Sequence, residues 1–328
     1  MKKRNLGLFI RLGLSVILLV VLFIIIDWQE LLTALAKIQI SEYLIGLLLY
    51  LGVMAFWSLR WYLLIRATDN PLPVSLRRVF RTILISVFYS NFLPTVVGTD
   101  MGRLYELSPD HKPTAAVAST VLLDRLIGLA SLVLMAVVAL LVGYHYANKQ
   151  GIILTIGFLV VALVVCWVLF FNENFIRRFR WLLTLPVINR GEQSLVRLYQ
   201  ALAFLQRQPK LIGLAVIVSL FMQSLEVFAV AFIARSLGMQ IDLFYFFVFL
   251  PIIWVIMTVP ITISGLGVRE SVFAFFFTQV GVAAVDAVAI SLLYYSFRVT
   301  VGLMGGLILL RHTVQDYLHT MLKKKVMT

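Results

Sequence analysis

The chain has 328 residues, of which 62% are hydrophobic and only 13% are charged, and its mean hydropathy is +1.00. Soluble domains are about half apolar and about a quarter charged, so this composition excludes a soluble globular protein. It predicts an all-α, polytopic membrane helix bundle. The single cysteine excludes an internal disulfide. Because the sequence contains no HExxH, P-loop or GxGxxG motif, we expect no metal and no other cofactor.

Apolar segments follow one another along nearly the whole chain. A helix needs about 20 apolar residues to cross roughly 30 Å of hydrocarbon. Seven segments reach or approach that length, and no long polar stretch separates them, so we expect a single membrane domain over residues 1–328. In chain order the expected spans are 7–26, 42–65, 114–144, 151–171, 211–234, 243–259 and 284–310.

Lysine and arginine are concentrated at both ends of the chain and in residues 66–81 and 172–210. Basic loops face the cytoplasm, so this distribution predicts cytoplasmic N- and C-termini in a cell membrane. The stretch "FIRRFRWLLTL" within 172–210 is typical of an amphipathic helix on an anionic lipid surface, although an ordinary cytoplasmic loop fits equally well. Either reading explains the net charge of +13 without nucleic acid. The segments expected outside are 27–42, 145–150 and 235–242.

The stretch "NFLPTVVGTDMGRLYEL", residues 91–107, interrupts this apolar pattern. Loop 66–81 and the start of the next span both belong in the cytoplasm, so residues 82–112 must enter the membrane and return. The segment is too short for two crossings, which predicts a re-entrant element. Its expected backbone breaks are Pro94, Gly98 and Gly102, and its charged residues are Asp100, Arg103 and Glu106.

A second interruption, "PITISGLGVRESVFAFFFTQVG", lies within residues 243–283, which must start and end outside. It has a similar order of breaks and charges but the opposite orientation. Such paired interruptions are typical of inverted-repeat transporters, where they mark the binding site. Its expected breaks are Pro260, Gly265 and Gly267, followed by Arg269 and Glu270.

Further charged residues lie inside the expected spans. A charge at mid-membrane costs about 2.5–3.5 kcal/mol on insertion scales, so we expect these groups to converge on a central polar cavity. We expect Arg103, Arg269 and Arg298 to bind phosphate there, because the planar guanidinium donates two hydrogen bonds at once. The full set of candidate substrate-binding residues is Asp100, Arg103, Glu106, Asp124, Arg125, Glu226, Arg269, Glu270 and Arg298.

Structural roles compete with these functional ones. Asp124 and Arg125 are also suited to tie helices together, and Glu226 is also suited to be a hydrogen-bond partner between helices. Arg60 lies near the inner end of its span, where we expect its side chain to extend to the interface.

Four motifs then carry a family resemblance: "GTDMGRLYEL", "STVLLDRLIGL", "SGLGVRESVF" and "YYSFRVTVGLMGGL". Their order and spacing resemble the flippase-like integral membrane family, which includes the membrane domain of lysylphosphatidylglycerol synthase. The chain departs from the family pattern at Thr99, at "TIS" before the second glycine motif, and at Phe297. The resemblance implies translocation of lipids, aminoacylated phosphatidylglycerol in some members and polyprenyl-linked sugars in others.

Together these observations predict a non-enzymatic protein that moves a phosphate-bearing lipid, phospholipid or polyprenyl-linked, between leaflets. Without an ATPase motif, movement would be downhill or coupled to an ion gradient, with Asp100, Glu106, Glu226 and Glu270 as candidate proton carriers. Two alternatives stay open. One is a membrane-embedded lipid-modifying transferase with one of these acids as base. The other is a non-transporting membrane partner of a cytoplasmic glycosyltransferase or synthase.

Overall fold

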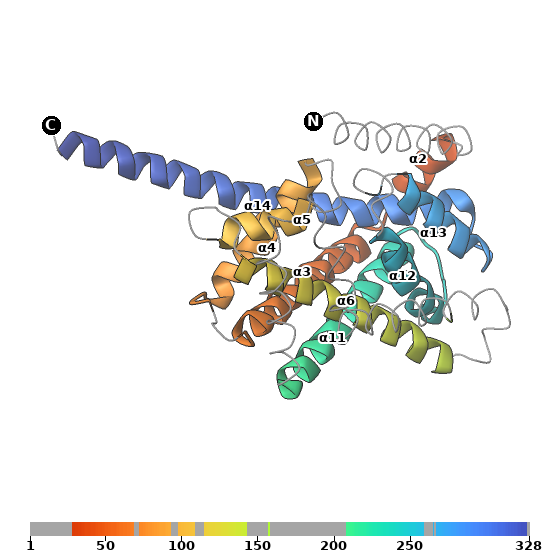
Figure 1. Cartoon of the computed structure of the whole chain (residues 1–328). Helices are drawn as coiled ribbons and strands as arrows, with labels where there is room; N and C mark the ends of the chain where they lie inside the picture. Colours follow the sequence, from red (N-terminus) through yellow and green to blue (C-terminus); the bar gives the residue numbers. More distant parts are fainter. Residues whose placement is uncertain are drawn as a thin grey trace, which may run out of the picture.

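The computed structural model describes two groups of helices, one in the N-terminal half and one in the C-terminal half of the chain (Figure 1). The described residues are 28–68, 72–92, 98–108, 115–142, 157, 208–258, 265 and 267–326. Within these ranges the chain forms helices joined by short connections and contains no strand, which confirms the predicted all-α class. The helices are α2 (Trp28–Ala36), α3 (Ile40–Arg66), α4 (Leu76–Phe92), α5 (Gly98–Leu107), α6 (Ala115–Val142), α11 (Pro209–Ser236), α12 (Leu243–Met257), α13 (Val268–Thr278) and α14 (Ala284–Val326).

Four of the described helices are long and apolar enough to cross a membrane, namely α3, α6, α11 and the first 28 residues of α14. They coincide with four of the expected spans and confirm a multi-pass membrane protein. A fifth expected span corresponds to α12, which is apolar but has only 15 residues. The expected span 7–26 lies outside the described residues, as do 151–171 apart from residue 157 and all but the end of the amphipathic segment 172–210.

Three segments expected to lie outside the spans contain helix. The external segment 27–42 contains α2 and the start of α3. In loop 66–81, α4 already begins at Leu76, where the Ser75 hydroxyl accepts a hydrogen bond from the Arg78 N–H at 3.3 Å and caps the first turn. Helix α14 continues past residue 310 to Val326, and Figure 1 shows this end projecting from the bundle. Lysine and arginine are good helix formers outside the lipid, so a fall in hydropathy marks the end of a span but not the end of a helix.

Helices α3 and α11 pack against each other at the centre of the bundle, while α14 runs along α4 and α12 lies against α6. Glycine permits the closest of these approaches. A Cβ atom on Gly305 of α14 would lie 2.0 Å from the Leu84 carbonyl oxygen of α4, and one on Gly46 of α3 would lie 3.0 Å from the Ala229 carbonyl oxygen of α11. Small residues at such contacts are the usual means of packing membrane helices.

Each expected interruption forms two helices, α4 with α5 and α12 with α13. In the second, Gly265 and Gly267 have φ angles of 74° and 81°, which glycine adopts without strain. In the first, Gly98 starts α5 and Gly102 lies inside it. Gly102 is therefore not a break, contrary to prediction; a Cβ there would meet the Cα of Ser86 at 2.8 Å, so the glycine lets α5 pack on α4. Pro94 and Pro260 lie outside the described residues.

Candidate functional site

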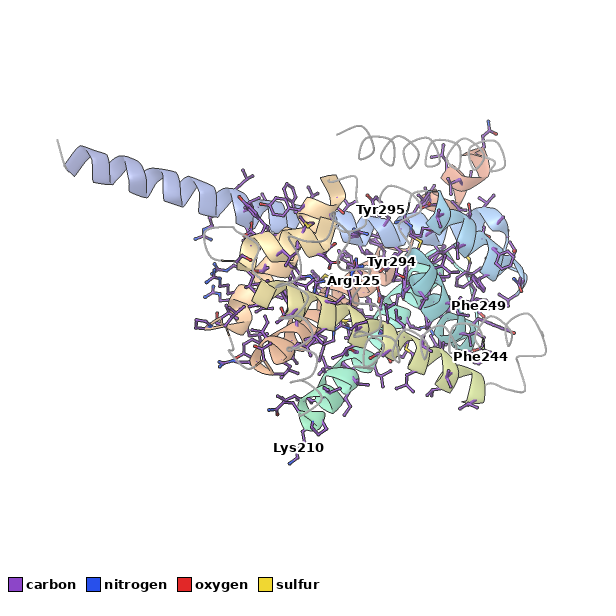
Figure 2. All side chains as sticks on the ribbon, viewed as in Figure 1. Arg125, Lys210, Phe244, Phe249, Tyr294 and Tyr295 are labelled. Carbon is purple, nitrogen blue, oxygen red and sulfur yellow. The ribbon has the colours of Figure 1, made fainter. Side chains whose placement is uncertain are left out.

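A cavity of about 380 Å³ lies inside the bundle and is lined by residues of α3, α4, α5, α6, α11, α12, α13 and α14. Five arginines and three carboxylates line it. The arginines are Arg60, Arg103, Arg125, Arg269 and Arg298, and the carboxylates are Asp100, Asp124 and Glu226. Figure 2 shows the labelled side chains of Arg125 and Tyr294 in the middle of the bundle, whereas Lys210 lies at the outer end of α11. The cavity thus brings together seven of the nine predicted binding residues, from both halves of the chain.

Asp124 of α6 is the centre of a buried ion network. Its Oδ1 accepts a hydrogen bond from Arg60 Nε at 2.7 Å, and its Oδ2 accepts one from Arg103 Nη1 at 2.7 Å and one from Trp57 Nε1 at 2.9 Å. Arg103 also lies over the rings of Trp57 and Trp61, 5.1 Å from each ring centroid. The carboxylate therefore ties α6 to α3 and α5.

Asp100 extends the network by one more arginine. It forms an ion pair with Arg103 through Oδ1 and with Arg125 Nε through Oδ2, the latter at 2.5 Å. The result is an alternating chain of three cations and two anions, with one formal positive charge in excess. Its order is Arg60, Asp124, Arg103, Asp100 and Arg125. Arg125 is the most accessible member, with a side chain 40% exposed.

The expectation that Arg60 extends to the interface was wrong. Its side chain is 6% exposed, and besides the Asp124 pair its Nη1 donates to the Ser219 hydroxyl at 3.0 Å. The reason is that the ion pair and hydrogen bond satisfy the guanidinium within the bundle, so it has no need to reach water. The sequence offered one signal: Arg60 lies more than a helical turn inside α3, between Trp57 and Trp61.

Arg269, the counterpart of Arg103 in the second interruption, is also buried but has a simpler environment. It forms an ion pair with Glu270, donates from Nε to the Ser291 hydroxyl at 3.0 Å, and lies 4.4 Å from the ring centroid of Tyr295. Glu270 Oε2 accepts a hydrogen bond from the Gly267 N–H at 2.7 Å, which closes the start of α13. Glu270 therefore supports the helix start and does not itself line the cavity.

Glu226 of α11 and Arg298 of α14 line the cavity without an ion-pair partner among the described residues. The Tyr294 hydroxyl donates to Glu226, so this carboxylate does bridge two helices. Arg298 Nη2 donates to the Ser90 hydroxyl of α4 at 2.8 Å. The remaining predicted residue, Glu106, accepts a hydrogen bond from Tyr89 at 3.1 Å and does not line the cavity.

Two buried polar atoms of cavity-lining residues have no hydrogen-bond partner among the described residues, Arg103 Nε and Gln223 Oε1. Buried polar groups are nearly always satisfied by protein, water or ligand, so the cavity offers both a donor and an acceptor. In the described part of the chain, no three His, Cys, Asp or Glu residues are placed to hold a metal ion. The arrangement of arginines around the cavity is suited to binding a polar, anionic group.

The comparison with protein families gave a match. The family model described as the lysylphosphatidylglycerol synthase TM region matches residues 8–306, which is most of the chain. The chain belongs to this family. Membership confirms the resemblance seen in the four motifs and indicates a membrane function related to lipids. Comparison with curated proteins and with solved structures gave no match.

Proposed function

We propose that this family member moves a phosphate-bearing lipid between the two leaflets of the membrane. The headgroup passes through the central cavity while the acyl or prenyl chains stay in the lipid. The observation that carries the proposal is a cavity lined by five arginines and three carboxylates inside a bundle of apolar helices. Charges are costly at membrane depth and are found there mainly on substrate or ion pathways.

We expect the phosphate to bind the arginines whose guanidinium N–H groups are not already used in ion pairs. Arg103 has two ion pairs and Arg269 one, and both side chains are at most 4% exposed. Arg298 has only its bond to Ser90 among the described residues, and Arg125 has one ion pair and a partly exposed side chain. A guanidinium with free N–H groups binds phosphate oxygens in a fork-like, charge-assisted geometry. We therefore assign the main phosphate contact to Arg298 and a second contact to Arg125.

An inverted repeat would give this cavity two-sided access. One unit would comprise α3, α4, α5 and α6, and the other α11, α12, α13 and α14. The contacts support this assignment: α3 packs on its counterpart α11, and the contact of α4 with α14 corresponds to that of α12 with α6. In this arrangement α4–α5 and α12–α13 are re-entrant pairs that enter from opposite sides. Inverted repeats transport by rocking around a central site.

The basic segments set the orientation we propose. Arg77, Arg78 and Arg81 lie at the start of α4, and the helix that ends the chain carries Arg311 and three consecutive lysines. The positive-inside rule places both in the cytoplasm, together with the N-terminus, and makes the cell membrane the expected location. Basic residues at that surface would also hold the protein against anionic lipid.

The test is lipid transfer in proteoliposomes that contain the purified protein and a headgroup-labelled phospholipid or polyprenyl phosphate. A membrane-impermeant quencher reports how fast label from the inner leaflet reaches the outer one. We expect Arg298→Gln and Arg298→Lys to slow transfer about tenfold or more, because a charged hydrogen-bond pair contributes about 1.5–3 kcal/mol. Arg311→Gln removes the same charge from an exposed position on the same helix and should have no effect.

The same samples separate the alternatives. Mass spectrometry of the recovered lipid would reveal a modified product if the protein were a transferase. Transfer no faster than in protein-free liposomes, with no modified lipid, would contradict both and favour a membrane partner of a cytoplasmic synthase or glycosyltransferase. Equal transfer by wild type and stable Arg298 variants would contradict the assignment of the phosphate contact.

A further inference from the structure

Glu226 and Arg298 are opposite charges that share a cavity without pairing. Every other described carboxylate in or beside the cavity has an arginine partner: Asp124 and Asp100 in the network, and Glu270 with Arg269. Glu226 has only the Tyr294 hydroxyl. Tyr294 and Arg298 are four residues apart on α14, so the phenol and the guanidinium lie on one face of that helix. A negative and a positive group therefore lie on neighbouring parts of the same wall.

The surroundings of Glu226 hold its position without neutralising it. The ring of Tyr294, whose hydroxyl donates to Glu226, packs edge-on against Tyr50 of α3, with centroids 5.6 Å apart. It also packs at a tilt against Trp254 of α12, with centroids 4.8 Å apart. Gln223, one turn earlier on α11, donates to the Gly128 carbonyl oxygen at 3.1 Å. The carboxylate is thus fixed by one hydroxyl among aromatic rings, where an unpaired charge is poorly solvated.

The other charged groups around the cavity are already committed. On α3, Arg60 is bonded to Asp124 of α6; on α5, Arg103 is bonded to both aspartates; and on α13, Arg269 is bonded to Glu270. Helix α12 contributes no charged residue to the cavity. Arg125 of α6 pairs with Asp100. Among the described residues, Arg298 is therefore the one cation of the cavity without an ion-pair partner, and Glu226 is the one anion without one.

We propose that Glu226 takes up one proton each time a lipid phosphate binds at Arg298, so that lipid and proton cross together. This proposal rests on the proposed function and adds its coupling ion. An ionised Glu226 would repel the phosphate and weaken its binding on the order of tenfold or more. By reciprocity, a bound phosphate favours the protonated carboxyl to the same extent. The proton joins a carboxylate oxygen of Glu226 from water and leaves when the headgroup leaves, while Tyr294 keeps its own proton.

Calorimetry on the purified full chain tests this directly. A water-soluble, short-chain phosphatidylglycerol is titrated into the protein at several pH values, in two buffers that differ in ionisation enthalpy. The difference in heat between buffers counts the protons taken up. We expect proton uptake that peaks in the pH range where Glu226 is ionised in the free protein and protonated in the complex, and that does not exceed one proton per bound lipid. Across that range affinity should fall by up to tenfold for each pH unit of increase, because linkage of one proton sets the limit of that slope. Glu226→Gln should bind with no proton uptake and no such slope.

Three further variants keep the outcome decisive. Glu226→Asp retains a carboxylate and should retain proton uptake, whereas Glu226→Ala, which like Glu226→Gln has no carboxylate, should lose it and serves if the glutamine variant fails to purify. Asp286→Asn removes a carboxylate at the start of α14, outside the cavity, and should leave proton uptake unchanged. Binding by wild type without proton uptake, or equal uptake by Glu226→Gln, would overturn the proton coupling while the lipid function stands. No binding of the phospholipid at any pH would contradict the proposed function itself and this inference with it.

Discussion

The two interruptions of the chain carry similar motifs but leave their charges in different states. In the first half, Arg103 is bound by Asp100 and Asp124 and joins a chain of five alternating charges. In the second half, Arg269 has a single carboxylate, and the nearby charges Glu226 and Arg298 have no ion-pair partner among the described residues. In the first half every cavity charge has an ion-pair partner, whereas in the second half two of them have none among the described residues.

This difference separates structural charges from those available for a ligand. A completed network holds helices together, and removing one member leaves its partners buried and unpaired. An uncompensated charge beside a cavity instead retains donors or acceptors for something that enters. The comparison therefore predicts large stability losses from the first half, and functional losses with small stability changes from the second.

The largest effect is expected from Asp124→Asn. The neutral side chain would leave Arg60 and Arg103 buried with one carboxylate fewer, at a cost of about 3–5 kcal/mol. We expect a strong fall in the unfolding temperature of the detergent-purified protein, measured by size exclusion after heating. Glu226→Gln is the matched variant, because it also replaces a cavity carboxylate by an amide but removes no ion pair, and it should unfold close to wild type. Equal losses in the two variants would break the comparison.

An intermediate effect is expected from Gly305→Ala, which tests the contact that carries Arg298 towards α4. A Cβ at this position would lie 2.0 Å from the Leu84 carbonyl oxygen, so α14 and α4 must separate. Overpacking of this kind costs about 1–3 kcal/mol, and we expect lower thermal stability together with slower lipid transfer. Gly213→Ala is the control, since nothing lies within 4 Å of its added methyl group. Identical behaviour of the two variants would show that this helix contact is looser than described.

The smallest effect is expected from Ser90→Ala, which removes the hydrogen-bond partner of Arg298 Nη2. Arg298 is only partly buried in a polar cavity, so water can replace the hydroxyl. We expect less than about 1 kcal/mol of lost stability and unchanged lipid transfer. A loss of stability as large as that of Asp124→Asn would mean that Arg298 is a structural charge like Arg103.

Sequence reasoning recovered the long helices and most of the charged cavity residues, but not their pairing. Periodic apolar runs and costly charges in lipid are local signals, and they identified Asp100, Arg103, Asp124 and Arg269. Pairing depends on which helices are neighbours. Arg60 and Asp124 are 64 residues apart in the chain, and their contact follows from the packing of α3 beside α6. That is why Arg60 was assigned to the interface, and why Glu106 was placed in a cavity that it does not line.

The sequence by itself determined that this protein lies in a lipid bilayer, that it is all-α, and to which family it belongs. These follow from composition, from runs of about 20 apolar residues, and from motifs that remain recognisable without coordinates. Only the tertiary structure decided which arginines are neutralised and which are left to bind a ligand. Opposite charges neutralise each other only when side chains from different helices lie within a few ångströms. The same residue types therefore link helices around Asp124 but are left without ion-pair partners at Glu226 and Arg298.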